Sequence, residues 1–378
     1  MAGKEPEFWS MVSAYDRWIE SQGIPIHRGY HVPDLRTLEL GWWKERECNG
    51  AFLVLAGQEE VSEARVTEIP PGKTLPPLKF AMDEIVYVAE GRGLTTVWGQ
   101  EGSPKKSFEW QKHSLFVLPR NATHQLSNMQ GDRAARMLHY NYLPLAMTTI
   151  PEPEFFFNNP YGNSDLLHGQ AAELYSQAKT FSPKQDSPAL SDSKKRSHRN
   201  FWYGNFFPNM SNWEHLQAQT GRGAGSHVVH LRFPNSAMCG HMSVFPKQTY
   251  KKAHRHGPGV VIVIPAGEGY SIMWQEGREQ VVIPWQEASV FVPPNRWFHQ
   301  HFNTGAVPAR YLAFHSPRGL VGYGERMEDI ARDQIEYVDE APWIRQKFAE
   351  EIAKHGVKSL MPDEAYKDRN FEWQYAQG

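Results

Sequence analysis

The segment WQKHSLFVLPRNATHQLSN, from Trp110 to Asn128, recurs 175 positions later as WQEASVFVPPNRWFHQHFN, from Trp285 to Asn303. Nine of the nineteen aligned pairs are identical: Trp110/Trp285, Gln111/Gln286, Ser114/Ser289, Phe116/Phe291, Val117/Val292, Pro119/Pro294, His124/His299, Gln125/Gln300 and Asn128/Asn303. Such a repeat indicates tandem copies of one structural unit. The copies run from about Gly29 to Leu145 and from about Gly204 to Leu320.

The apolar pattern within each copy predicts strands. Short runs rich in β-branched and aromatic residues end at Gly or Pro, as at Ile85–Val88, Leu115–Leu118, Val260–Ile264 and Val290–Val292. Helical spacing occurs only near the ends, from Phe8 to Ile19 before Gly23 and from Pro342 to Ile352 before Gly356. We therefore expect an all-β fold of two duplicated antiparallel β-sandwiches or barrels with short helical N- and C-terminal segments.

Composition narrows the functional classes. The 378 residues include 40 Lys+Arg and 42 Asp+Glu, a formal charge of −2, so there is no cationic excess for nucleic-acid phosphates. The two cysteines, Cys48 and Cys239, are too few for a disulfide framework, which favours a reducing compartment. No segment has the apolar length of a membrane span or the core of a signal peptide. We expect a cytoplasmic protein without nucleic-acid or membrane partners.

Four histidines in the second copy carry the strongest functional signal. His254 and His256 form one HxH pair, and His299 and His301 form another about forty residues later. Residues two apart on a strand share a face, so two such pairs on facing strands can bring three or four imidazoles together. Neutral imidazole is the commonest protein ligand of divalent transition metals. The pattern predicts a metal site.

The order HxH, GxG and PxxxxHxxxN resembles the metal-binding signatures of the cupin superfamily, and the duplication resembles a bicupin. That family pattern places a glutamate ligand beyond the second histidine with three or four residues between them, where this chain has Val260 and Val261. The site is therefore similar to the three-histidine centre of non-haem Fe(II) cupin dioxygenases. It looks closest to the bicupins that cleave the rings of gentisate, salicylate and 1-hydroxy-2-naphthoate.

This resemblance implies His254, His256 and His299 as metal ligands, with Fe(II) as the metal and Mn, Ni or Zn as alternatives. It also implies a homo-oligomer. The first copy has Leu78 to Ala81 where the histidine pair would be, and it keeps Glu84 and His124 at the places of the glutamate and the third histidine. We expect five segments: a helical extension (1–28), a degenerate, metal-free first barrel (29–157), a polar linker (158–203), a metal-binding second barrel (204–322) and a helical tail (323–378).

Other residues are candidates for contact with substrate. His301 lies beside the ligands in sequence, and Tyr250 and Trp297 flank them. Arg310 and His315 lie on one late strand with opposite parity, so only one of them can point inward. An inward Arg310 would bind a carboxylate in a bidentate manner.

Three neutral ligands leave a divalent metal with net positive charge and open positions. This arrangement favours an anionic, aromatic or enolisable small-molecule substrate together with O₂. The leading hypothesis is a dioxygenase that cleaves a C–C bond of a hydroxylated aromatic acid. The alternatives are a metal-dependent lyase, isomerase or decarboxylase on the same scaffold, or a non-catalytic small-molecule binding protein.

Overall fold

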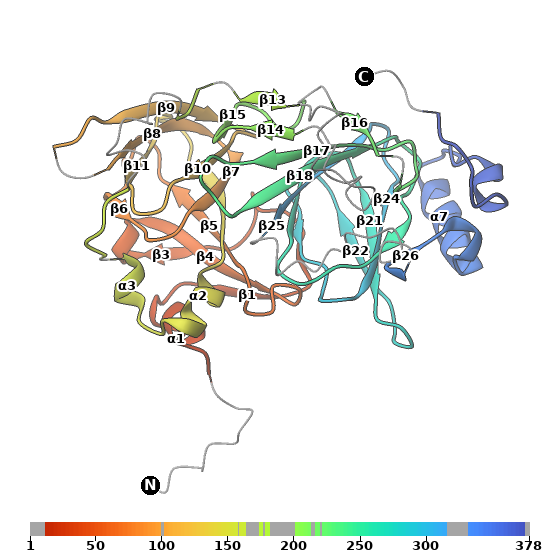
Figure 1. The fold of residues 1–378 in the computed structure, drawn as a ribbon, viewed down its shortest axis with the longest axis horizontal. Helices are drawn as coiled ribbons and strands as arrows, with labels where there is room; N and C mark the ends of the chain where they lie inside the picture. Colours follow the sequence, from red (N-terminus) through yellow and green to blue (C-terminus); the bar gives the residue numbers. More distant parts are fainter. Residues whose placement is uncertain are drawn as a thin grey trace, which may run out of the picture.

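The structure, a computed structural model, describes residues 12–99, 102–157, 159–163, 174–176, 178–181, 201–212, 216–219, 221–315 and 332–374. These residues form four β-sheets, with helices near the two ends of the chain and after the strands of the first barrel (Figure 1). The basic run Lys194–Arg199 and most of the expected linker lie outside the described residues.

The first barrel pairs an eight-stranded sheet with a four-stranded sheet. The larger sheet has the order β1-β4-β5-β12-β7-β10-β15, with β3 beside β4: β1 Ile26–Gly29, β3 Gly41–Trp43, β4 Cys48–Leu55, β5 Glu63–Ile69, β7 Glu84–Glu90, β10 Leu115–Leu118, β12 Ala135–Asn141 and β15 Phe206–Phe207. The smaller sheet has the order β6-β11-β8-β9: β6 Leu78–Lys79, β8 Arg92–Trp98, β9 Lys106–Gln111 and β11 Thr123–Asn128.

The second barrel repeats this plan. Its larger sheet has the order β13-β14-β17-β18-β25-β20-β23-β2, with β16 beside β17: β2 His31–Val32, β13 Lys179–Phe181, β14 Phe201–Tyr203, β16 Gln217–Ala218, β17 His227–Arg232, β18 Cys239–Phe245, β20 Val261–Ala266, β23 Val290–Phe291 and β25 Ala309–His315. Its smaller sheet has the order β22-β21-β24-β19-β26: β19 Ala253–His254, β21 Gly269–Trp274, β22 Val281–Trp285, β24 Phe298–Asn303 and β26 Gln334–Ile335. The predicted fold class, an all-β pair of duplicated barrels with short helical segments, is confirmed.

The two barrels exchange a strand. β2 belongs by sequence to the first copy but pairs with β23 of the second, where Val32 lies opposite Val290. β15 makes the reciprocal pairing with β10 of the first barrel, where Phe207 lies opposite Leu115. Equivalent serines hold both crossings, because Ser289 Oγ donates to Pro33 O at 2.5 Å and Ser114 Oγ donates to Pro208 O at 2.7 Å.

The expected segment boundaries at 29, 204 and 323 need correction. β1 and β14 are equivalent strands that begin before Gly29 and Gly204, so each copy starts about three residues earlier than the identities suggested. The opening segment of each copy then crosses to the other barrel. The expected C-terminal tail also contributes to the second barrel, because β26 pairs with β19. The barrels are therefore structural units that do not coincide with contiguous halves of the chain.

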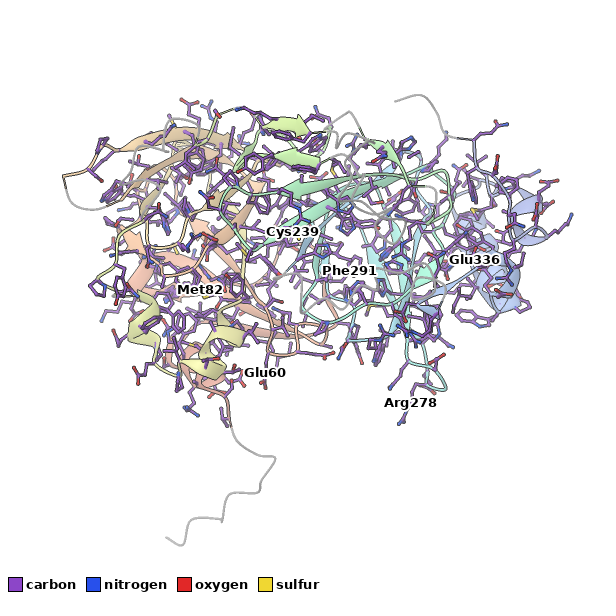
Figure 2. All side chains as sticks on the ribbon, in the orientation of Figure 1. Glu60, Met82, Cys239, Arg278, Phe291 and Glu336 are labelled. Atoms are coloured by element: carbon purple, nitrogen blue, oxygen red, sulfur yellow. The ribbon has the colours of Figure 1, made fainter. Side chains whose placement is uncertain are left out.

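The largest apolar core lies between the two large sheets. It joins first-barrel residues such as Leu53, Tyr87 and Leu138 to second-barrel residues such as Leu312 and Phe314. Each barrel also has an interior core of its own. Figure 2 shows how densely side chains fill both barrels, with Phe291 among the strands of the second. This packing fixes which strand face points into each barrel.

Helices close the ends of the molecule (Figure 1). α1 (Ala14–Ser21) begins at Ser13, whose Oγ accepts a hydrogen bond from the Asp16 N–H at 3.0 Å. Together with α2 (Leu143–Thr149) and α3 (Pro153–Phe157), it packs an apolar cluster around Phe80 and Met82 of the first barrel. α7 (Pro342–Lys354) packs Ile344, Phe348 and Ile352 against the second barrel, as the helical spacing predicted.

Candidate metal centre

Three histidines of the second barrel converge in its interior. β19 pairs with β24 so that His254 lies opposite His299, and His256 follows two residues after His254. One ring nitrogen from each lies within 4.8 Å of the others, and the three residues are only 7%, 3% and 1% exposed in the order His254, His256 and His299. The structure thus brings together the three predicted metal ligands.

The hydrogen bonds of these rings leave nitrogen atoms for a metal. His256 Nδ1 lies 2.7 Å from Gly257 O and His299 Nδ1 lies 3.2 Å from Trp297 O, so each Nδ1–H donates to a carbonyl. His299 Nε2 and His254 Nδ1 are buried without a hydrogen-bond partner. Buried polar atoms in this state are costly unless something satisfies them, and a metal ion would. The donor set therefore fits a divalent transition metal.

Electrostatics keep the three imidazoles neutral. Burial lowers the pKa of His256 to about 4 and lowers those of His254 and His299 well below 6.5. The nearby Arg222 guanidinium lowers the pKa of all three further. Neutral imidazole is the form that binds metal, so the ligands are ready for metal at neutral pH.

The ligand cluster of the described residues contains no carboxylate. Of the two valines at the family's glutamate position, Val260 packs into the interior core of the second barrel and Val261 packs into the core between the barrels. Neither side chain can coordinate a metal.

His301 lies inside the barrel beside the cluster. Its ring centroid is 5.6 Å from that of His299 and 5.0 Å from that of Tyr311. His301 Nδ1 is 2.8 Å from Ser271 Oγ, which also accepts the Trp285 indole N–H at 3.0 Å. Ser271 thus fixes the orientation of the His301 ring.

The parity of the late strand places Tyr311 and His315 inside and Arg310 outside. His315 is buried and lies 2.8 Å, Nε2 to Nδ1, from His241 on the neighbouring β18. Arg310 is only partly buried, and its neighbours Leu312 and Phe314 on the same face pack between the barrels. The Arg310 side chain therefore does not point into the barrel, and it cannot bind a substrate carboxylate there as the inward alternative required.

The structure does not bring Tyr250 to the metal ligands either. Its ring packs on Phe302 at 4.7 Å between centroids and on Phe348 of α7, outside the barrel. Trp297 is half-buried and packs near Tyr30, so its contribution to the cluster is the carbonyl that accepts from His299. Closeness in sequence put both aromatics near the ligands, but the pairing shifts by one residue between Tyr250–Phe302 and His254–His299, so Tyr250 does not share the face of His254.

Three interior residues escaped the sequence reasoning. Lys251 is fully buried, and its Nζ donates to Gln219 Oε1 and Ser243 Oγ at 2.7 Å and to Tyr311 OH at 3.1 Å. Arg222 Nη1 donates to Gln334 Oε1 at 2.9 Å, and Gln334 is the register partner of His254. His241 forms the pair with His315. None of the three belongs to a motif, so only the tertiary fold could identify them.

The first barrel is built differently at the same place. Leu78 lies opposite His124 in the register that places His254 opposite His299, and burial lowers the pKa of His124 to about 3. Glu84 is buried and bonded to Arg65 and to His139 Nδ1, the latter at 2.7 Å. The first barrel therefore has an apolar side chain opposite its one matching histidine, and a buried ion pair elsewhere in its interior.

The comparisons with known proteins concern overall fold. No family model and no curated protein matches the chain. Among solved structures, a variant of oxalate decarboxylase from Bacillus subtilis is 10% identical over 89% of this chain and 85% of its own, with a TM-score of 0.47. Vicilin from Corylus avellana is 13% identical over 75% of this chain and 84% of its own, with a TM-score of 0.43. In the described part of the chain, no helix has the length and apolarity to cross a membrane.

Proposed function

We propose that the protein is a metal-dependent enzyme that cleaves a C–C bond in a small anionic substrate and uses O₂ as co-substrate. His254, His256 and His299 hold the metal, with Fe(II) the first choice. The observation that carries this proposal is the convergence of three buried, neutral imidazoles with no carboxylate among them, two of which, His254 and His299, have a ring nitrogen without a hydrogen-bond partner.

The metal would supply a Lewis-acidic and redox-active centre with net positive charge and open positions. The residues of the chain provide the rest. Carbonyl groups of Gly257 and Trp297 fix the ring orientation of two ligands, and the surrounding apolar side chains exclude water. His301, held by Ser271, lies where it can contact a bound substrate.

A second candidate is a redox-neutral reaction, such as decarboxylation or another lyase reaction, on the same metal centre. Cleavage of a C–C bond without an oxidant leaves a carbanion or enolate, which must receive a proton. The buried groups Lys251 and His315, with the partly buried His241, are proton carriers in the interior of the same barrel. They support this candidate independently of the ligand geometry.

The ligand assignment is tested by metal analysis of the wild type and of His256→Ala, with the exposed His355→Ala as matched control. We expect about one metal ion per chain in the wild type and the control, and less than about a tenth of that in His256→Ala. Circular dichroism should show that all three proteins are folded. Full metal content in His256→Ala would refute the assignment.

The reaction class is tested by oxygen uptake with hydroxycarboxylate and diketone substrates, in air and under anaerobic conditions. Consumption of O₂ in proportion to substrate supports the dioxygenase. Turnover that continues without O₂, on a metal other than iron, would overturn it in favour of the redox-neutral candidate.

A further inference from the structure

The two barrels differ in where their interior negative charge comes from. In the first barrel, the Glu84 carboxylate is 1% exposed and accepts from His139 Nδ1 at 2.7 Å, from Asn141 Nδ2 at 3.2 Å and from the Arg65 guanidinium. The pKa of Glu84 is held far below its usual value: burial opposes ionisation, but the charges of Arg65 and His139 outweigh it. The first barrel thus contains a permanent carboxylate with a built set of donors.

The strand registers identify the corresponding residues of the second barrel. Ile85 pairs with Tyr140, so Glu84 lies opposite Asn141; Val261 pairs with Phe314, so Val260 lies opposite His315. On the neighbouring strand, His241 stands where the first barrel has Arg65. The carboxylate has been replaced by an aliphatic side chain, whereas two of the residues around it have become imidazoles.

The two imidazoles form a donor pair. His241 Nδ1 and His315 Nε2 share one hydrogen bond of 2.8 Å, and in either tautomer the neutral pair carries a second N–H. The groups whose charges act on this pair are His256, His230, Lys251 and Arg232. All of them are cationic or neutral, so the pair faces an environment that favours an anion.

We propose that a carboxylate of the ligand occupies, in the second barrel, the place that the Glu84 side chain fills in the first, between the His241–His315 pair and the metal ligands. The chain supplies this carboxylate itself in the first barrel and leaves it to the ligand in the second. This inference deepens the proposed function by placing the anionic group of the substrate, and it rests on that function for the metal.

The test uses acetate as the probe and acetamide as its neutral isostere, titrated calorimetrically into metal-free and Co(II)-loaded protein. Val260→Glu returns a chain carboxylate to this place, and Val260→Ala is its control for altered packing. His315→Leu removes the donor, whereas His315→Asn restores the side chain that the first barrel uses. Thermal unfolding of each variant checks that it is folded.

We expect the wild type to bind acetate at least about tenfold more tightly than acetamide, which is the cost of about one charge-assisted hydrogen bond. Val260→Glu and His315→Leu should each weaken acetate binding by about tenfold, with Val260→Ala and His315→Asn within about threefold of the wild type. If Val260→Glu does not fold, the comparison of His315→Leu with His315→Asn decides alone.

Equal binding of acetate and acetamide by the wild type would overturn the inference, as would wild-type acetate affinity in both Val260→Glu and His315→Leu. Failure of the wild type to bind Co(II) would refute the metal centre instead. In that case, acetate binding by the metal-free protein still decides whether the carboxylate site exists.

Discussion

Asn128 and Asn303 are equivalent residues that the repeat retains in both barrels, and their side chains tie loops together. Asn303 is fully buried; its Nδ2 donates to Pro246 O at 3.1 Å and to Val307 O at 2.9 Å, and its Oδ1 accepts from Gly305 N at 3.0 Å. Asn128 repeats this arrangement with Arg133 O and Gln130 N. The asparagine of the PxxxxHxxxN pattern is therefore a structural residue.

Replacing Asn303 by Asp should destabilise the fold without removing metal. A carboxylate cannot donate to the two carbonyl groups, and it would be buried against their oxygens. We expect a loss of about 1–3 kcal/mol in the free energy of unfolding, measured by urea denaturation. Metal content per folded chain should match the wild type. A variant as stable as the wild type would contradict this structural role.

At the residue scale, the sequence predicted which side chains share a strand face, because strand alternation alone determines this. His254, His256 and His299 share a face because they occupy alternate strand positions on a registered pair. The choice between Arg310 and the set Tyr311 and His315 stayed open, because alternation gives relative parity but not which face is inside. Arg222 lies 32 positions before His254 and is linked to it through Gln334, so no local pattern reveals it.

At the element scale, the segment from β26 to α7 is bound to the strands that carry the metal ligands. β26 pairs with β19 beside His254. Glu340, just before α7, accepts from the Tyr250 hydroxyl and from Gln300 Nε2, the latter at 3.2 Å. Gln300 lies between His299 and His301 on β24. A two-residue strand has no periodicity to detect, so the sequence predicted the helix but missed this attachment.

Glu340 makes the attachment sensitive to pH, because burial raises its pKa to about 7. From about pH 4.5 to pH 7, the folded protein keeps a proton that the unfolded chain releases, so this residue lowers stability as pH rises. Glu340→Gln keeps hydrogen-bonding capacity and removes the charge. We expect the variant to be more stable than the wild type by about 1–2 kcal/mol at pH 8 and by less than about 0.5 kcal/mol at pH 5.

Urea midpoints measured from pH 5 to pH 8 check this prediction. The control is Glu350→Gln, which changes an exposed carboxyl on α7. A difference between Glu340→Gln and the wild type that does not grow with pH would show that Glu340 is not protonated in the folded protein.

At the scale of the whole molecule, the exchange of β2 and β15 makes the barrels depend on each other. Each large sheet ends in a strand from the other copy, and the largest apolar core is shared. The duplication was readable from nineteen aligned residues. The strand exchange could not be predicted from the sequence. A strand of two residues has no pattern that distinguishes pairing with its own copy from pairing with the other copy.

Cleavage of the chain between Phe181 and Phe201 should therefore leave the molecule assembled. A protease site introduced within residues 182–200 allows this test. After cleavage, we expect both fragments to elute together at the size of the intact chain, whereas either fragment expressed alone aggregates. Separation of the fragments into two folded species, without denaturant, would contradict mutual dependence. The uncut protein with the same insertion is the control.

The strand exchange also bears on how such a chain can change over generations. A duplicated gene often loses the copy that no longer performs the chemistry. Here the copy without the histidine pair supplies β2 to the wall of the barrel that has it, opposite Phe291 and Val290. Loss of the first copy would open that wall and expose the shared core, so selection for the chemistry of one barrel preserves both.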